Sequence, residues 1–325
     1  MTGAAPKAPG EVIEGVYLCS SFDLSDFYGA ALEAYPDIRV YRPEEVPDPA
    51  RIRFALVWRP APDAFDAYPN IELVQANAAG VDGVLGNPGL PRNVTVTRVH
   101  DEEQAAIMAG FAAWHVVWHH RQMGHYIDAQ RRSAWDRQTI KTLRPPSQVT
   151  VGLLGYGLMG RAIARTVASM GFPVLAASRT GGDAAKGVTR ISGDDAVQRV
   201  AARSDILINI MPLTPVTRDI LNAALFDRMP RGAALIQLGR GKHLVDDDLL
   251  TALDSGQIGG ASLDVFQQEP LPPDHPFWRH PRILVTPHEA SVTSAAAVSR
   301  ELARSLRAMR AGQRPEQAVD RTTGY

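Results

Sequence analysis

Three side chains suited to carbonyl chemistry follow apolar runs in the second half of the chain. Arg240 comes after one run, His288 follows the last run, and Glu269 lies in a loop between them. A cation stabilises negative charge that develops on a carbonyl oxygen, and a histidine exchanges protons near neutral pH. A neighbouring carboxylate stabilises the imidazolium form of histidine. These residue types predict the interconversion of a carbonyl and a hydroxyl group.

Each of these three residues also has a structural alternative. Arg240 could cap a helix, Glu269 could be a loop charge, and His288 could be a histidine satisfied by its own loop. Arg240 and His288, with Asp264 between them, come at the ends of apolar runs. The carboxyl ends of parallel strands are where ligands bind in α/β sheets, so the placement favours chemistry.

A glycine-rich turn at Gly155, Gly157 and Gly160 lies in the middle of the chain. It has the G-x-G-x-x-G spacing, with an apolar run at 151–154 before it and a helical run at 158–170 after it. The glycines of such turns allow a pyrophosphate to approach the backbone, and the helix N-terminus faces the phosphates. A turn that serves packing alone is the alternative, and the strand–turn–helix context favours a dinucleotide.

The end of the next strand bears on which dinucleotide binds. Enzymes that use NAD place an acid there for the ribose 2′-hydroxyl, but this chain has Ser178, Arg179 and Thr180. A carboxylate would repel a 2′-phosphate by about 4 kcal/mol for a unit-charge pair about 4 Å apart. Arg179 attracts phosphate instead, with Lys186 nearby, although a solvated arginine is the alternative. The sequence predicts NADP, as NADPH, as the preferred cofactor, with NAD possible.

Composition excludes several classes of protein. The 325 residues suffice for two domains, and 34 basic against 35 acidic residues give no polyanion-binding surface, so we expect no nucleic-acid partner. A single cysteine, Cys19, forms no internal disulfide and is expected to be buried. The first ten residues lack the apolar core of a signal peptide, and no apolar run approaches the ~20 residues of a membrane span. We expect a cytoplasmic protein without a membrane partner.

Five short apolar runs precede the glycine-rich turn and predict a small α/β sheet. They are Gly15–Cys19, Ile38–Tyr41, Phe54–Trp58, Leu73–Ala76 and Val94–Thr97. The stretch Glu102–His125 then carries apolar residues at spacings of three and four, which predicts one long helix.

Six further runs alternate with helical segments and predict a doubly wound parallel sheet. The first begins at Thr150, and the others are Val174–Ala177, Ile206–Ile210, Ala233–Leu238, Ala261–Val265 and Ile283–Thr286. We therefore expect an α/β protein with two Rossmann-like domains. The dinucleotide-binding domain spans 99–288. The substrate domain is discontinuous, 1–98 and 289–325, and is completed by the C-terminal helix predicted within Ser291–Ala311.

Seven stretches, spread over nearly the whole chain, match sequence motifs of one enzyme family. They are Asn77–Asp82, Val151–Gly160, Met211–Thr217, Leu238–Leu253, Asp264–Pro273, Thr286–His288 and Val319–Tyr325. Together they resemble the D-isomer-specific 2-hydroxyacid dehydrogenases, especially the glyoxylate/hydroxypyruvate reductase A branch.

The resemblance implies specific roles. Arg240 binds the substrate's carboxylate and carbonyl, His288 is the acid and base, and Glu269 pairs with His288. Backbone amides around Ala79 and Gly80 hold the carboxylate. Asp264 faces the nicotinamide carboxamide, or else only caps the following loop. The cofactor-binding set is Gly155, Gly157, Leu158, Met159, Gly160, Ser178, Arg179, Thr180, Pro212, Leu213, Thr217, Leu238, Gly239 and Asp264.

The function implied is reduction of glyoxylate, hydroxypyruvate or a related small 2-keto acid to the D-2-hydroxy acid, with His288 as proton donor. The helix at 102–125 is expected to form a homodimer contact. A β-hydroxyacid dehydrogenase is an alternative, but that family begins with its glycine-rich turn. A nucleotide-sensing, corepressor-like binding protein on the same fold is another. Formate dehydrogenases pair the histidine with glutamine, so Glu269 argues against them.

Some positions depart from the family pattern or suggest other chemistry. Gly110 replaces the usual glutamate, and we expect close helix packing there. Glu289 adds a charge beside His288, which would favour its protonated form or discourage acidic substrates. His115 and His119 have a helical spacing seen in metal sites, with His120 next to them, but no paired acid or cysteine accompanies them, so we assign no metal.

Overall fold

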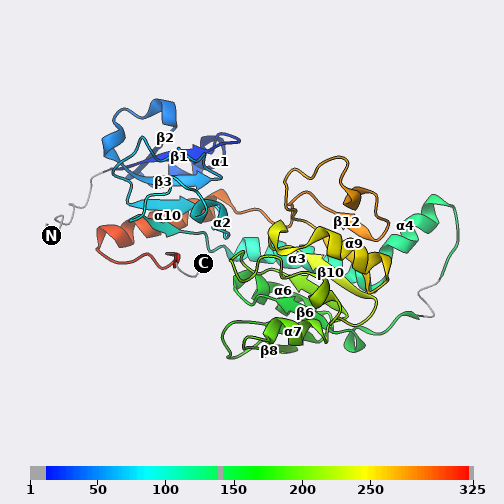
Figure 1. Cartoon of the computed structure of the whole chain (residues 1–325). Coiled ribbons are helices and arrows are strands. Elements are labelled where there is room, and N and C mark those ends of the chain that lie inside the picture. The colour runs from blue at the N-terminus through cyan, green and yellow to red at the C-terminus, as the bar shows by residue number, and fades with distance from the viewer. Residues whose placement is uncertain (1–11, 138–141, 322–325) are drawn as a thin grey trace. The chain divides into compact units, whose positions relative to one another are not determined.

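The computed structural model describes residues 12–137 and 142–321. The chain divides into two compact units: residues 1–103 with 293–325, called here the discontinuous unit, and residues 104–292, called the central unit. Each boundary lies a few residues C-terminal to the position expected from the sequence. Both units are parallel sheets with helices, as predicted (Figure 1).

The discontinuous unit is built on a five-stranded parallel sheet with the order β2-β1-β3-β4-β5. Each predicted run forms a strand: β1 Ile13–Cys19, β2 Ile38–Tyr41, β3 Ile52–Trp58, β4 Leu73–Ala76 and β5 Thr95–Thr97. The order reverses at β1 and β3, which makes this a doubly wound sheet.

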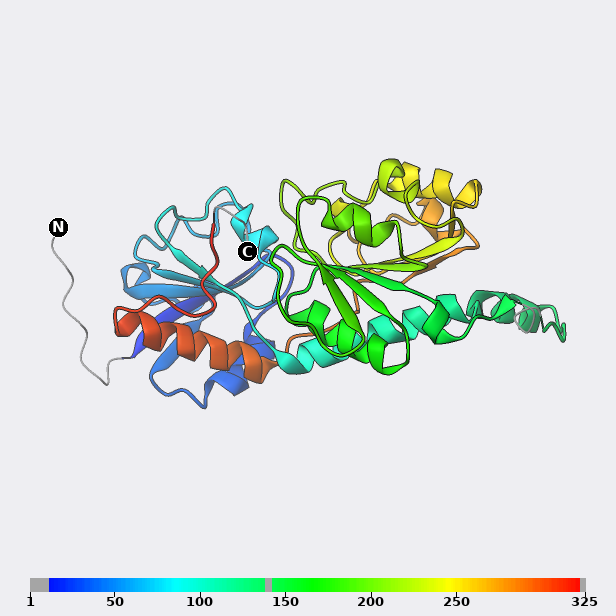
Figure 2. The ribbon, with the colours of Figure 1, turned by 90° about the horizontal axis from the view of Figure 1, so that it is seen from below.

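The last helix of the chain completes this unit. Its helices are α1 (Ser25–Leu32), α2 (Asp82–Leu85) and α10 (Ala295–Arg310). Helix α10, orange to red, lies beside the blue α1 and strands of this unit (Figures 1 and 2). Val298, Leu302 and Leu306 of α10 are buried against Leu24 and Leu56, so burial of one apolar face fixes the helix here.

The central unit is built on a seven-stranded parallel sheet with the order β12-β11-β10-β9-β6-β7-β8. Its strands are β6 Val151–Leu154, β7 Val174–Ala177, β8 Val188–Ile191, β9 Ile206–Asn209, β10 Ala233–Gln237, β11 Ile258–Leu263 and β12 Ile283–Val285. Six of them match the predicted runs. Strand β8 was not predicted, because only Ile191 of its four residues is buried and an edge strand shows little apolar pattern.

Helices flank this sheet, except that α4 projects away from it (Figures 1 and 2), and one predicted helix is broken in two. They are α3 Glu102–His120, α4 Met123–Arg131, α6 Leu158–Ser169, α7 Ala196–Ala201, α8 Ala223–Phe226 and α9 Asp246–Asp254. The single helix predicted over Glu102–His125 is wrong, because Gln122 has a left-handed backbone, φ +51°, that interrupts the hydrogen-bond ladder before α4.

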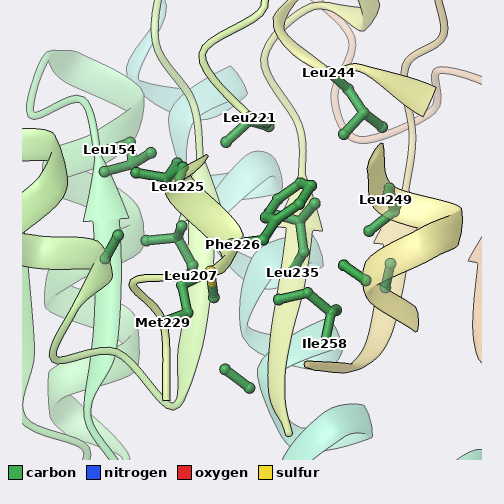
Figure 3. Close-up of a cluster of buried hydrophobic side chains, with 14 of the residues drawn as sticks. Leu154, Leu207, Leu221, Leu225, Phe226, Met229, Leu235, Leu244, Leu249 and Ile258 are labelled. Carbon is green, nitrogen blue, oxygen red and sulfur yellow. The ribbon is translucent and has the colours of Figure 1, made fainter. Parts of the chain in front are cut away.

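Buried side chains of the central unit pack its helices against the parallel strands. Figure 3 shows one cluster, in which Phe226 of α8 lies among Leu207 of β9, Leu235 of β10 and Leu249 of α9. The strand order reverses between β6 and β9. Ligands of doubly wound sheets bind at this reversal, beyond the carboxyl ends of the strands.

Candidate active site

The glycine-rich turn has the shape that a bound pyrophosphate requires. Gly155 has φ +105°, and a Cβ on Gly160 would lie 2.2 Å from the carbonyl oxygen of Gly155, so larger residues are excluded. A Cβ on Gly157 would meet nothing within 4 Å. Because Gly157 also leaves the N-terminus of α6 without a side-chain cap, the backbone amides there suit a phosphate, and the turn fits a dinucleotide. Leu158 and Met159 open α6 and are half-buried.

The residues after β7 are accessible to a ligand in differing degrees. Arg179, Thr180 and Lys186 are exposed, whereas Ser178 is half-buried. The Ser178 hydroxyl donates to the Thr180 carbonyl at 2.8 Å and accepts from Nε of Arg190 at 3.3 Å. The predicted cofactor ligand Ser178 is therefore used within its own loop. Arg190, which sequence reasoning missed, contacts this loop from β8.

Arg240 lies in the loop after β10, and buried polar side chains hold this loop. The carbonyl of Arg240 accepts from Nε2 of Gln237 at 2.9 Å, and Oε1 of Gln237 accepts from Nδ2 of Asn209 at 2.8 Å. Gln237 and Asn209 are fully buried. These hydrogen bonds shape the loop from Leu238 to Arg240, where Leu238 and Gly239 are buried and Arg240 is half-buried.

His243 also positions the loop of Arg240, a role that the sequence did not reveal. Its Nδ1 accepts from the backbone N–H of Arg240 at 3.1 Å, so Nε2 carries the proton and donates to the carbonyl of Pro212 at 3.2 Å. The fully buried ring thus joins the Arg240 loop to the loop after β9. Residue type gave no signal, because the role depends on a contact 31 positions away.

The loop after β9 contains three predicted cofactor ligands. Pro212 is exposed, and Leu213 and Thr217 are half-buried. The Thr217 hydroxyl donates to the Pro212 carbonyl at 2.8 Å and accepts from the N–H of Thr214 at 2.8 Å. Thr217 therefore closes this loop, and its hydroxyl is engaged inside it.

Glu269 and His288 form the expected pair. Nδ1 of His288 lies 2.9 Å from Oε2 of Glu269, and the side chains are 33% and 19% exposed. The other carboxylate oxygen of Glu269 accepts from the backbone N–H of Phe266 at 3.1 Å, which fixes the carboxylate. Because Nδ1–H points at Glu269, Nε2 is the nitrogen that carries an exchangeable proton.

Asp264 holds the turn that carries His288. One carboxylate oxygen accepts from the Thr286 hydroxyl at 2.7 Å and the Glu289 N–H at 2.9 Å, and the other from the Ala290 N–H at 3.0 Å. Asp264 is 1% exposed. These contacts fit the loop-capping alternative, and the contact with the nicotinamide carboxamide stays a prediction. The Glu289 side chain is exposed beside His288.

The sheet brings Arg240, Asp264 and His288 to one edge. Strands β10, β11 and β12 are neighbours and parallel, and the three residues follow their carboxyl ends. Ala79 and Gly80, the predicted carboxylate ligands, belong to the discontinuous unit. They are half-buried and follow the carboxyl end of β4 in that unit's own sheet.

Three weaker expectations fall on α3 and β1. Gly110 is exposed and a Cβ there would meet nothing within 4 Å, so packing within this chain does not require glycine. His119 accepts or donates a hydrogen bond at 2.8 Å to Ser262, and burial lowers the pKa of His115 to about 4. Among the described residues no group of three or more His, Cys, Asp or Glu is arranged to hold a metal. Cys19 is half-buried, not buried.

Within the described part of the chain, no helix combines the length and apolar character needed to cross a membrane.

Comparison with known proteins gives a consistent result. Residues 113–290 match the model of the D-isomer specific 2-hydroxyacid dehydrogenase NAD-binding domain. A glyoxylate/hydroxypyruvate reductase A of Serratia proteamaculans is 40% identical over 281 residues, 84% of this chain and 87% of that protein.

Two solved structures cover nearly the whole chain. A D-isomer specific 2-hydroxyacid dehydrogenase of Xanthobacter autotrophicus, in complex with NADPH, has a TM-score of 0.88 and 35% identity over 96% of this chain and 99% of that one. An NADPH-dependent glyoxylate/hydroxypyruvate reductase of Sinorhizobium meliloti, in complex with NADP and sulfate, has a TM-score of 0.88 and 34% identity over the same shares.

Proposed function

Because this chain belongs to the D-isomer specific 2-hydroxyacid dehydrogenase family, we propose that it reduces glyoxylate, hydroxypyruvate or a related small 2-keto acid. The product is the D-2-hydroxy acid and the electron donor is NADPH. The pair of Glu269 and His288, at the sheet edge that also carries Arg240, is the observation that supports this best. Relatives named as glyoxylate/hydroxypyruvate reductases support the substrate class.

The residues of the edge have complementary tasks in this proposal. When bound, the reduced nicotinamide supplies a hydride to the carbonyl carbon. The carbonyl π electrons move to oxygen, where the guanidinium of Arg240 stabilises the charge and Nε2 of His288 delivers the proton that completes the hydroxyl. Glu269 orients the imidazole through Nδ1 and places a negative charge beside it.

The glycine-rich turn and the loop after β7 support NADPH as the donor. The turn would offer amides to a pyrophosphate, and 178–180 contains an exposed arginine and no carboxylate. Two solved relatives hold NADPH or NADP.

The proposal includes a homodimer formed through α3. Ile107, Trp114 and Val117 are 49%, 52% and 38% exposed at helical spacing, and Gly110 lies among them. Apolar residues on one helix face favour a partner surface, and a glycine within it allows close approach. We also place the enzyme in the cytoplasm, since its single cysteine leaves it without an internal disulfide.

A panel of 2-keto acids with NADPH and NADH tests the activity. We expect NADPH oxidation with glyoxylate and hydroxypyruvate, and slower oxidation with NADH. His288→Asn should lower kcat by about 10²–10⁴-fold, the usual contribution of a general acid, with the Kd of NADPH unchanged. The matched control is His280→Asn, because His280 also lies near a carboxylate, 3.6 Å from Asp254, but away from the edge.

Two outcomes would contradict the proposal. Tight NADPH binding without oxidation of any keto acid would indicate a nucleotide-sensing protein. Wild-type turnover by His288→Asn would remove His288 from the mechanism.

A further inference from the structure

The 178–183 loop, which follows β7, is held by an arginine that lies outside it. Arg190 of β8 donates from Nε to the Ser178 hydroxyl at 3.3 Å and from Nη1 to the Asp183 carbonyl at 3.1 Å. Nη2 donates to the Thr180 carbonyl. Three donors of one rigid guanidinium thus fix three points of the loop. Arg179 lies between two of these points and is exposed.

The same guanidinium also contacts the glycine-rich turn. Its central carbon lies 5.0 Å from the centroid of the Tyr156 ring, a distance at which cation and ring attract each other. The hydroxyl of Tyr156 accepts from the backbone N–H of Ala185 at 3.4 Å. Arg190 therefore connects the 178–183 loop to the turn expected to hold the pyrophosphate.

Gly182 gives the guanidinium its space. Its φ is +128°, a conformation that L side chains rarely adopt, and a Cβ there would lie 2.9 Å from Nη1 of Arg190. The loop's backbone and the Arg190 side chain are thus fitted to each other. Lysine cannot replace the arginine here, because a single ammonium lacks the planar fork that reaches three acceptors at once.

We propose that Arg190 is a positioning residue for cofactor selection. By fixing the 178–183 loop it holds Arg179 where a 2′-phosphate is favoured over a 2′-hydroxyl, so the preference for NADPH depends on a side chain of the neighbouring strand. The inference rests on the proposed function in requiring a dinucleotide. Selection of the 2′-phosphate then depends on the shape of the loop as well as on the charge of Arg179.

Binding of two nucleotide fragments separates shape from charge. Titration calorimetry on the whole protein would compare adenosine 2′,5′-bisphosphate with ADP. Arg190→Lys keeps the positive charge. We expect it to raise the Kd of the bisphosphate about tenfold, the equivalent of about 1.4 kcal/mol, and to leave the Kd of ADP nearly unchanged. In turnover, the KM for NADPH should rise while kcat stays constant. Arg199→Lys is the matched control, since Arg199 of α7 pairs with Asp195, the residue before that helix.

A double-mutant cycle tests whether Arg190 acts through Arg179. In an Arg179→Ala background the loop has lost the group that it positions, so Arg190→Lys should weaken bisphosphate binding little further. Full additivity of the two losses would overturn the proposal, because it would mean that each arginine acts independently.

The remaining outcomes are equally decisive. If the wild-type protein prefers the bisphosphate and Arg190→Lys, with an unchanged Tm, keeps that preference, this inference fails and the proposed function stands. If the Kd values of both nucleotides rose equally, Arg190 would serve general stability, and this inference would also fail. A wild-type protein that does not discriminate would refute the NADPH preference and this inference with it.

Discussion

His288 has a left-handed backbone, φ +59°, which a residue with a Cβ adopts only at a cost. The hydrogen bonds of Asp264 to the two residues that follow hold this conformation in place. The imidazole is then directed by Glu269 through Nδ1. At the scale of single residues, the carboxylate of Asp264 holds the backbone conformation of His288, and the carboxylate of Glu269 fixes the orientation of its ring.

Glu269→Gln tests the second of these carboxylates. The variant keeps a group that can hydrogen-bond Nδ1 but loses the charge that stabilises the imidazolium. Since the imidazolium would lose its charged partner, we expect kcat for keto-acid reduction to fall while the Kd of NADPH stays unchanged. Steady-state kinetics with NADPH titration measures both, and a wild-type kcat would show that the charge of Glu269 does not serve His288.

Asp264→Asn tests the first carboxylate. The amide NH2 of the variant would replace a carboxylate oxygen that now accepts a backbone N–H. Two buried hydrogen-bond donors would then face each other. We expect the free energy of unfolding to fall by about 1–3 kcal/mol, the cost of an unsatisfied buried polar group. kcat should fall as well, whereas NADPH binding should persist. Denaturant unfolding with steady-state kinetics checks this, and an unaltered kcat would separate the turn from catalysis.

At the scale of elements, helix α3 combines an exposed apolar face with the buried His115 and the half-buried His119. Burial lowers the pKa of His115 to about 4 and of His119 to about 3. Among the described residues neither ring nitrogen of His115 has a hydrogen-bond partner, and the ring packs on Phe111 and Trp114. Both histidines are therefore neutral in the folded protein at neutral pH.

The stability of the fold should consequently decrease in mild acid. Between pH 6.5 and 4 the unfolded chain binds a proton at His115 that the folded chain does not, so lowering the pH favours unfolding, by up to about 1.4 kcal/mol per pH unit for one group. His115→Phe preserves the ring packing and should reduce this slope. The free energy of unfolding, measured from pH 7 to pH 4, checks it. An equal slope in the variant would contradict the assignment.

At the scale of the whole molecule, the apolar face of α3 predicts self-association. Trp114→Glu should convert the dimer into a folded monomer, because a carboxylate would be buried in an apolar contact. Trp278→Glu is the matched control, since Trp278 is 49% exposed and lies outside α3. Sedimentation at several concentrations measures the result. A monomeric wild-type protein would refute the dimer.

Local sequence patterns were sufficient for most of the architecture. Eleven apolar runs became strands, and the glycine-rich turn lies between β6 and α6 as its spacing requires. Two elements were misjudged for local reasons. Strand β8 has little apolar surface because it lies at the edge, and the left-handed Gln122 leaves no mark in the spacing of apolar residues.

The sequence by itself determined which residue types stand at strand ends, because hydrophobic alternation and glycine spacing are local properties of the chain. It gave the Arg240, Glu269 and His288 set and the missing acid after β7. Only the tertiary structure decided which side chains support them. Asp264, His243 and Arg190 each make a hydrogen bond to a residue 12 to 31 positions away. Their contacts exist because strand pairing in one register aligns the loops, and no short stretch of sequence encodes that alignment.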